Sequence, residues 1–198
     1  MLQDLDATLA AMLEAEFPVG NVDISFTPPD DQFPPAHVTL PALSFFLYDI
    51  RENRELRPGQ RELERTNGAF TLTPPPVRVA CSYLITAWPS PSAPDPIQDE
   101  HRLLGEVMKV LLRHPKIPEE YLRGELAGQE PRLPARIIAD MQLQSLGELW
   151  LAMGGKPKAA LHYAVTIGVT VFEPSDAGPV VTDKTIKIST GLPRPKER

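Results

Sequence analysis

The 198-residue chain contains one cysteine, Cys81, and lacks any long apolar run. A single thiol excludes an intramolecular disulfide framework and a zinc site built from several cysteines. No apolar stretch approaches the roughly 18–20 residues that cross a bilayer, so no direct membrane insertion is expected. The first residues carry no positive charge ahead of their apolar stretch. This argues against a signal peptide, and we therefore expect synthesis and assembly in the cytoplasm.

Basic residues are also in short supply. The chain has 20 Lys and Arg against 26 Asp and Glu, which gives a formal net charge of −6. Proteins that bind nucleic acid present a basic face to the phosphates, so a nucleic-acid partner is not expected. The hydrophobic share of 42% is nevertheless high enough for a folded domain of ordinary size.

Proline, in contrast, is abundant. It accounts for 23 of the 198 residues, well above the usual share of about 5%. The prolines gather between segments that read clearly as helix or strand, where they predict stiff, extended connections rather than disorder. These connections lie at 28–41, 74–76, 89–96 and 115–134, and after Gly178.

Hydrophobic periodicity predicts an α+β fold. Apolar spacing of three or four residues predicts helices over 2–17, 97–114 and 146–153. Alternating or continuous apolar residues predict strands at 22–27, 43–50, 77–88, 135–139 and 160–172. Since strands lead and helices arrive later, we expect a single domain with a mixed, mostly antiparallel sheet flanked by helices. This domain would span residues 1–172, followed by an extended or partly disordered C-terminal tail at 173–198.

Two strands have specific expectations. In 77–88, every second residue from Val77 to Ala87 is hydrophobic, and these residues, Cys81 among them, share one face of the strand. We expect Cys81 to be buried and inert, as free cysteines usually are. The strand at 43–50 is almost entirely apolar and is expected to be covered on both faces.

Residues 51–65 form a charged excursion. They carry five arginines and four glutamates before the turn signal Asn67-Gly68, which predicts an exposed hairpin arm that returns through 70–73. One interpretation is a solvated, salt-bridged arm; the other is a protein-contact element, because arginine is enriched at interfaces. The candidate contact residues are Arg51, Glu52, Asn53, Arg54, Glu55 and Leu56.

The tail has two interpretations as well. From Asp183 onward it is basic, and 185–188 has the alternation of a short strand. The tail is either disordered or donates this strand to a neighbouring molecule. Its candidate contact residues are Lys184, Ile186 and Ile188.

No motif for catalysis or metal binding stands out. There is no P-loop, Gly-rich dinucleotide turn or G-x-S-x-G sequence, and no histidine is paired with another histidine or cysteine at helical spacing. We therefore predict that the protein binds no cofactor and no metal. A role in binding or assembly is favoured over an enzymatic role. The alternative is a small soluble ligand-binding protein or hydrolase. Its site would use scattered residues such as Tyr48, Asp49, His101 and His162.

Four stretches of sequence together resemble a known family. In the same order, they are typical of the cap, or tail-terminator, proteins of extracellular contractile injection systems, which are phage tail-like particles with an inner tube inside a contractile sheath. The resemblance covers roughly residues 2–172. The stretches are LSFFLYDIRENRELR (43–57), PPPVRVACSYLITAW (74–88), DEHRLLGEVMKVLLRHPKIP (99–118) and SLGELWLAMGGKPKAALHYAVTI (145–167).

The resemblance implies a structural role. A protein of this kind would form a homohexameric ring that closes the distal end of tube and sheath and stops their polymerisation, with the tube protein and the sheath protein as partners. It would have no catalytic residues, and the arm that begins at Arg51 would contribute to ring or tube contacts. A related alternative is an adaptor or connector on a phage-like tail. The completed particle would be released or associated with a membrane.

Overall fold

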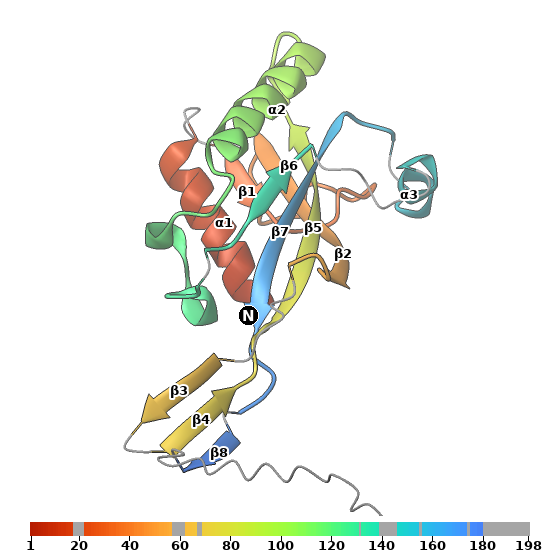
Figure 1. Ribbon diagram of the computed structural model, residues 1–198. Coiled ribbons are helices and arrows are strands. Elements are labelled where there is room, and N and C mark those ends of the chain that lie inside the picture. The colour runs from red at the N-terminus through yellow and green to blue at the C-terminus, as the bar shows by residue number, and fades with distance from the viewer. Residues whose placement is uncertain are drawn as a thin grey trace, which may run out of the picture. The chain divides into compact units, whose positions relative to one another are not determined.

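The computed structural model describes residues 1–17, 22–56, 62–66, 69–130, 132–138, 146–154, 156–173 and 175–179. The chain divides into two compact units (Figure 1). The main unit contains Met1–Arg57 and Pro76–Val169, and the small unit contains Pro58–Pro75 and Thr170–Arg198.

A five-stranded sheet forms the centre of the main unit. Its strand order is β1-β2-β5-β7-β6, in which β1 runs parallel to β2 and all other neighbours are antiparallel. This confirms the expected mixed, mostly antiparallel sheet of an α+β domain. The strands are β1 (Asp23–Ser25), β2 (Ala42–Glu52), β5 (Val77–Trp88), β6 (Ala135–Ile137) and β7 (Ala160–Val169).

Two helices cover one face of this sheet (Figure 1). Helix α1 (Leu2–Glu16) and helix α2 (Pro96–Arg113) start and stop close to the positions that periodicity predicted. The Asp95 side chain accepts a hydrogen bond of 3.2 Å from the Gln98 N–H and so caps α2. Two 3₁₀ turns follow α2, η1 (Glu119–Tyr121) and η2 (Gly124–Leu126), and a short helix, α3 (Leu146–Ala152), precedes β7.

The predicted core face of β5 is confirmed. Cys81, Tyr83, Ile85 and Ala87 are all fully buried, and they pack in one cluster with apolar residues of α1 and α2. Burial raises the pKa of the Cys81 thiol to about 11, so the thiol stays protonated at neutral pH.

The opposite face of the sheet is buried too, which the alternation in the sequence did not predict. Leu84 and Thr86 are fully buried, and His162 is 5% exposed. Part of the cover comes from the proline-rich segment between β1 and β2, where the Phe33 ring packs 4.5 Å from the Trp88 ring. Loop residues therefore replace the second helical layer on this part of the sheet.

Four strands differ from the predictions in extent or in burial, and one of them, β6, ends at Ile137 before its predicted end at residue 139. Strand β1 is shorter than expected and spans only three residues, although its alternating apolar side chains do pack on the core. β1 pairs with β2 only as far as Ser44; beyond it, no described strand pairs with this edge of β2, and Ile50 is 49% exposed. The expected cover on both faces thus holds only for the first half of β2. Strand β7 ends at Val169 because its partner β5 begins opposite, at Val77.

The small unit is a three-stranded antiparallel sheet of β3 (Glu62–Thr66), β4 (Ala69–Thr73) and β8 (Ser175–Pro179), in the order β3-β4-β8. Thr66 pairs with Ala69, which confirms the expected hairpin; the turn residues 67–68 lie outside the described residues. Part of the predicted extended tail thus forms β8. None of the helices in the described part of the chain is both long enough and apolar enough to span a membrane.

Candidate interaction surfaces

The predicted contact segment begins where β2 leaves the sheet. The Asn53 N–H donates to the Arg78 carbonyl at 2.7 Å, and its side-chain amide donates to the Thr166 hydroxyl at 3.1 Å. Asn53 therefore ties the end of β2 to β5 and β7. Beyond this anchor Arg54 has 85% of its side chain exposed, and Glu55 and Leu56 are exposed as well.

Salt bridges accompany the same segment, as the solvated interpretation predicted. Arg51 pairs with Asp49 at 2.8 Å, and Arg54 pairs with Glu52 at 3.6 Å. Such exposed pairs contribute little to stability, with a median of about 0–1 kcal/mol. Protein contact by residues 51–56 stays a prediction. The other candidate contact residues, Lys184, Ile186 and Ile188, lie outside the described residues.

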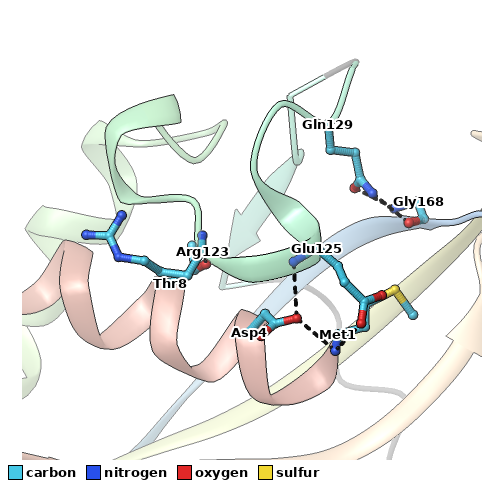
Figure 2. Close-up of polar contacts among 7 residues, drawn as sticks. All are labelled: Met1, Asp4, Thr8, Arg123, Glu125, Gln129 and Gly168. Carbon is cyan, nitrogen blue, oxygen red and sulfur yellow. Dashed lines mark hydrogen bonds and ion pairs between the residues drawn. The ribbon is translucent and has the colours of Figure 1, made fainter.

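Polar contacts join α1 to the segment that follows α2 (Figure 2). The Asp4 carboxylate bridges two donors, the N-terminal ammonium group at 2.9 Å and the Glu125 N–H at 3.3 Å. The first of these is the main reason why the pKa of Asp4 is lowered. One turn further along α1, the buried Thr8 hydroxyl accepts from the Arg123 N–H at 3.0 Å. These bonds satisfy backbone donors at the start of the second 3₁₀ turn, η2, and in the residue before it.

The same segment is also bound to the sheet (Figure 2). The Gln129 amide donates to the Gly168 carbonyl at 2.6 Å and accepts from the Gly168 N–H at 2.8 Å. A side-chain amide thus pairs with β7 as a neighbouring strand would. The described part of the proline-rich connection after α2 is therefore hydrogen-bonded to both α1 and β7. Its stiffness stays a prediction.

Of the four residues proposed for a hydrolase, the structure brings Tyr48 and His162 into contact. A β-bulge makes Tyr48 the extra residue of β2, and its hydroxyl is hydrogen-bonded to Nε2 of the buried His162. Asp49 is paired instead with Arg51, and His101 is exposed on α2. Within the part of the chain that the structure describes, no three His, Cys, Asp or Glu side chains come close enough together to hold a metal ion.

A hollow of about 570 Å³ lies beside the first turn of α2, and we call it the Trp88 hollow. The Lys158 ammonium group lies 4.6 Å from the centre of the Trp88 ring and forms an ion pair with Glu100. The sequence signal for this hollow was Trp88 itself, a large aromatic on the polar side of an alternating strand. The hollow is lined by Pro29, Asp30, Asp31, Phe33, Trp88, Ile97, Glu100, Gly154, Lys156, Pro157, Lys158 and Ala159.

A second, shallower hollow of about 410 Å³ lies beside the last turn of α2, and we call it the Ile138 hollow. Two of its apolar side chains are exposed, Leu112 by 54% and Ile138 by 62%. Its one charged lining residue is Arg136. The complete lining is Leu111, Leu112, Pro115, Ala135, Arg136, Ile137 and Ile138.

Comparison with known proteins agrees with the resemblance expected from the sequence. The family model described as the Pvc16 N-terminal domain matches residues 4–183. No curated protein sequence matches the chain.

Two of the solved structures that are similar to this chain are terminator or cap proteins. One is the sheath/tube terminator, in its extended state, of PVC, an extracellular contractile injection system. Its TM-score is 0.70 at 26% identity, and the match covers 97% of this chain and 65% of that one. The other is the tube-terminating cap of the anti-feeding prophage, with a TM-score of 0.67 at 27% identity over 95% of this chain and 62% of that one. The chain thus spans less than two thirds of either protein.

Proposed function

Because this chain belongs to the family of the Pvc16 N-terminal domain, we propose that it is a structural cap of a contractile injection particle. It would bind the distal end of the inner tube and sheath. The observation that carries this proposal is the structural match over 97% of the chain to a sheath/tube terminator.

The mechanism we propose is geometric. Six copies would form a closed ring on the last ring of tube subunits, each contacting the next through two different surfaces, as closed rings with more than two members require. The ring would cover the subunit edges on which the next tube or sheath ring would assemble. Polymerisation would stop because no such edge is left exposed.

The same ring would connect tube and sheath at this end of the particle. Contraction of the sheath would then move the tube, since both are held by one protein. The exposed residues Arg54, Glu55 and Leu56 support a role in such contacts because they project beyond the Asn53 anchor. The role requires interaction surfaces and no reaction, so we propose that the protein is not an enzyme and needs no cofactor.

The test is to assemble particles with and without this protein and to measure their length by electron microscopy. We expect particles of uniform length, with labelled protein at one end only, when it is present. Tubes of variable, greater length should form when it is absent. Label distributed along the shaft would contradict the proposal. Label at a junction with a further component, in a copy number other than six, would indicate an adaptor instead.

A further inference from the structure

Helix α2 carries a different kind of hollow at each of its two ends. The helix has 18 residues, which corresponds to a length of about 27 Å at 1.5 Å per residue. Ile97 and Glu100 in its first turns line the Trp88 hollow, whereas Leu111 and Leu112 in its last turn line the Ile138 hollow. The two hollows are therefore separate surfaces of the main unit. Figure 1 shows where α2 and β6 lie.

The Trp88 hollow combines aromatic walls with carboxylates. Its Lys158 is already paired with Glu100, and both side chains are largely buried, with 17% and 14% exposed. Asp30 and Asp31 also line the hollow and form no ion pair within the described residues; Lys156 is the remaining cation of its lining. Ile97, 65% exposed, adds an apolar rim. A basic group with apolar neighbours therefore fits this surface.

The Ile138 hollow has the complementary character. Arg136 is exposed and has no ion pair with any described residue, and Lys116 next to the lining is exposed as well. Beside Arg136, the side chains of Leu112 and Ile138 leave more than half of their surface in solvent. Exposed apolar residues beside an arginine that has no ion-pair partner among the described residues are typical of an interface.

Ile138 has an unusual backbone that supports the same interpretation. Its φ is 57°, in the left-handed region that β-branched residues rarely adopt. The conformation is held by a hydrogen bond of 2.9 Å from its N–H to the His162 carbonyl. Backbone strain of this kind is concentrated at functional sites. Here the strained residue presents an apolar side chain to solvent.

We propose that the Ile138 hollow of one copy packs against the Trp88 hollow of the next copy, with Arg136 facing Asp30 and Asp31. This inference rests on the proposed function, because a closed ring requires two different, complementary surfaces on each subunit. Charge complementarity selects a second copy of this chain as the occupant, since the same molecule carries both the basic apolar surface and the acidic one. When two subunits are joined in this way, one still has a free Ile138 hollow and the other a free Trp88 hollow. Further subunits can therefore be added until the ring closes.

Chemical cross-linking tests the contact directly. Ile97→Cys and Ile138→Cys place one thiol at each hollow, and the native Cys81 does not interfere because it is fully buried. A short bismaleimide added to purified particles, and to free protein, should give a ladder of covalent multimers with I97C/I138C. Each single variant should give no ladder, because each interface would then hold only one thiol. A ladder with I138C alone, or cross-links to tube or sheath protein only, would overturn the proposal.

Charge reversal provides an independent test. Asp31→Arg and Arg136→Glu change exposed side chains, so monomer melting should stay the same. Each single reversal should lower ring formation, measured as cap occupancy of particles and as multimers of free protein, by at least about tenfold. The double variant D31R/R136E should recover most of the loss. Equal occupancy in all four proteins, or loss without recovery, would exclude this contact.

The two proposals fail in different ways. If labelled protein is absent from particle ends while I97C/I138C still forms a ladder in free protein, the cap role is wrong and the contact stands. If the protein occupies the ends but neither cross-linking nor charge reversal gives the expected result, the cap role stands and the contact is wrong.

Discussion

At the scale of single residues, Gly124 has the least room for a side chain among the glycines in the described part of the chain. Its φ is 55°, and a β-carbon there would overlap the Asp4 carboxyl group, which is held by two hydrogen-bond donors. Gly128 has a φ of 71° but has open space around it. We expect Gly128→Ala to lower the free energy of unfolding by about 1–2 kcal/mol through backbone strain alone. Gly124→Ala should cost roughly 1–2 kcal/mol more, because it also displaces Asp4.

Urea unfolding of the two alanine variants measures this difference. The G128A variant is the matched control, since both glycines follow or belong to the same 3₁₀ turn and share the left-handed conformation. Equal destabilisation would show that the Asp4 contacts in Figure 2 contribute nothing to stability.

Asp6 predicts a pH dependence. Burial raises the pKa of its carboxyl group, and the hydrogen bond of 2.7 Å from the Tyr83 hydroxyl offsets part of that rise. A raised folded-state pKa means that the folded protein binds this proton more tightly than the unfolded chain does. The stabilisation is complete below the usual Asp pKa of about 3.9 and is lost as the pH rises through the raised value.

Asp6→Asn removes this titration and keeps an oxygen that accepts from Tyr83. The stability of D6N relative to the unsubstituted protein should therefore increase between pH 3 and pH 7. Urea midpoints across this range test the sign. A stability difference that does not change with pH would mean that the Asp6 pKa is the same in the folded and unfolded chains.

Alternation in the sequence predicted the burial of one face of the sheet but not the burial of the other face. The side chains of Cys81, Tyr83 and Ile85 alternate as a core face should, and the structure buries them. Thr86 and His162 are polar, so alternation assigns them to solvent, yet both are buried. Some of their contacts come from residues distant in sequence: His162 is hydrogen-bonded to Tyr48, and the Trp88 indole that donates to Thr86 packs against Phe33. Local periodicity carries no information about such contacts.

At the scale of elements, the segment after β2 contains one residue that is bonded to the sheet, followed by three residues that are exposed to solvent. Asn53 is bonded to β5 and β7, whereas Arg54, Glu55 and Leu56 are exposed. We expect Asn53→Ala to lower the free energy of unfolding by about 1 kcal/mol, because the buried Thr166 hydroxyl loses its donor. The triple variant R54A/E55A/L56A should change it by no more than about 0.5 kcal/mol.

The same two variants should have the opposite order of effect on particle assembly: R54A/E55A/L56A should lower cap occupancy more than N53A does. If the exposed residues contact the ring or the tube, R54A/E55A/L56A lowers cap occupancy while its melting temperature stays normal. N53A is the control for general destabilisation. A truncation of residues 52–65 would be less informative, because it also removes the Asn53 anchor. Normal particle length and normal occupancy with the triple variant would exclude this segment from the contacts.

Element boundaries were predicted well where local signals decide them. Helix α2 begins at a proline behind the Asp95 cap and ends before a proline, both visible in the sequence. Strand ends depend instead on the partner. The apolar residues Val171 and Phe172 extend the alternation of β7, but β5 offers no residue beyond Val77 to pair with them, and both are exposed. The hollows at the ends of α2 depend on tertiary contacts in the same way.

At the scale of the whole molecule, the division into two compact units predicts that the main unit can be produced without the small unit. In the main unit, Glu52 pairs with Val79 and the Asn53 N–H is bonded to Arg78, so β2 and β5 are neighbours where the chain leaves for the small unit. A tight Asn-Gly turn could replace the intervening residues, because antiparallel neighbours need only two residues to connect them. Ending the chain after Val169 would remove the remainder of the small unit.

We expect this shortened main unit to fold, because its five strands and the apolar cluster beneath α1 and α2 are complete without the small unit. Its melting temperature should lie within a few degrees of that of the full chain. If the small unit or the exposed residues 54–56, which the turn also replaces, contribute contacts to tube or sheath, the shortened protein should still cross-link through I97C/I138C but should not restore uniform particle length. The R54A/E55A/L56A variant separates these two contributions. Full restoration of particle length would assign the capping contacts to the main unit alone. If the shortened protein does not fold, the main unit depends on the small unit for its stability, and the two units form one cooperative folding unit.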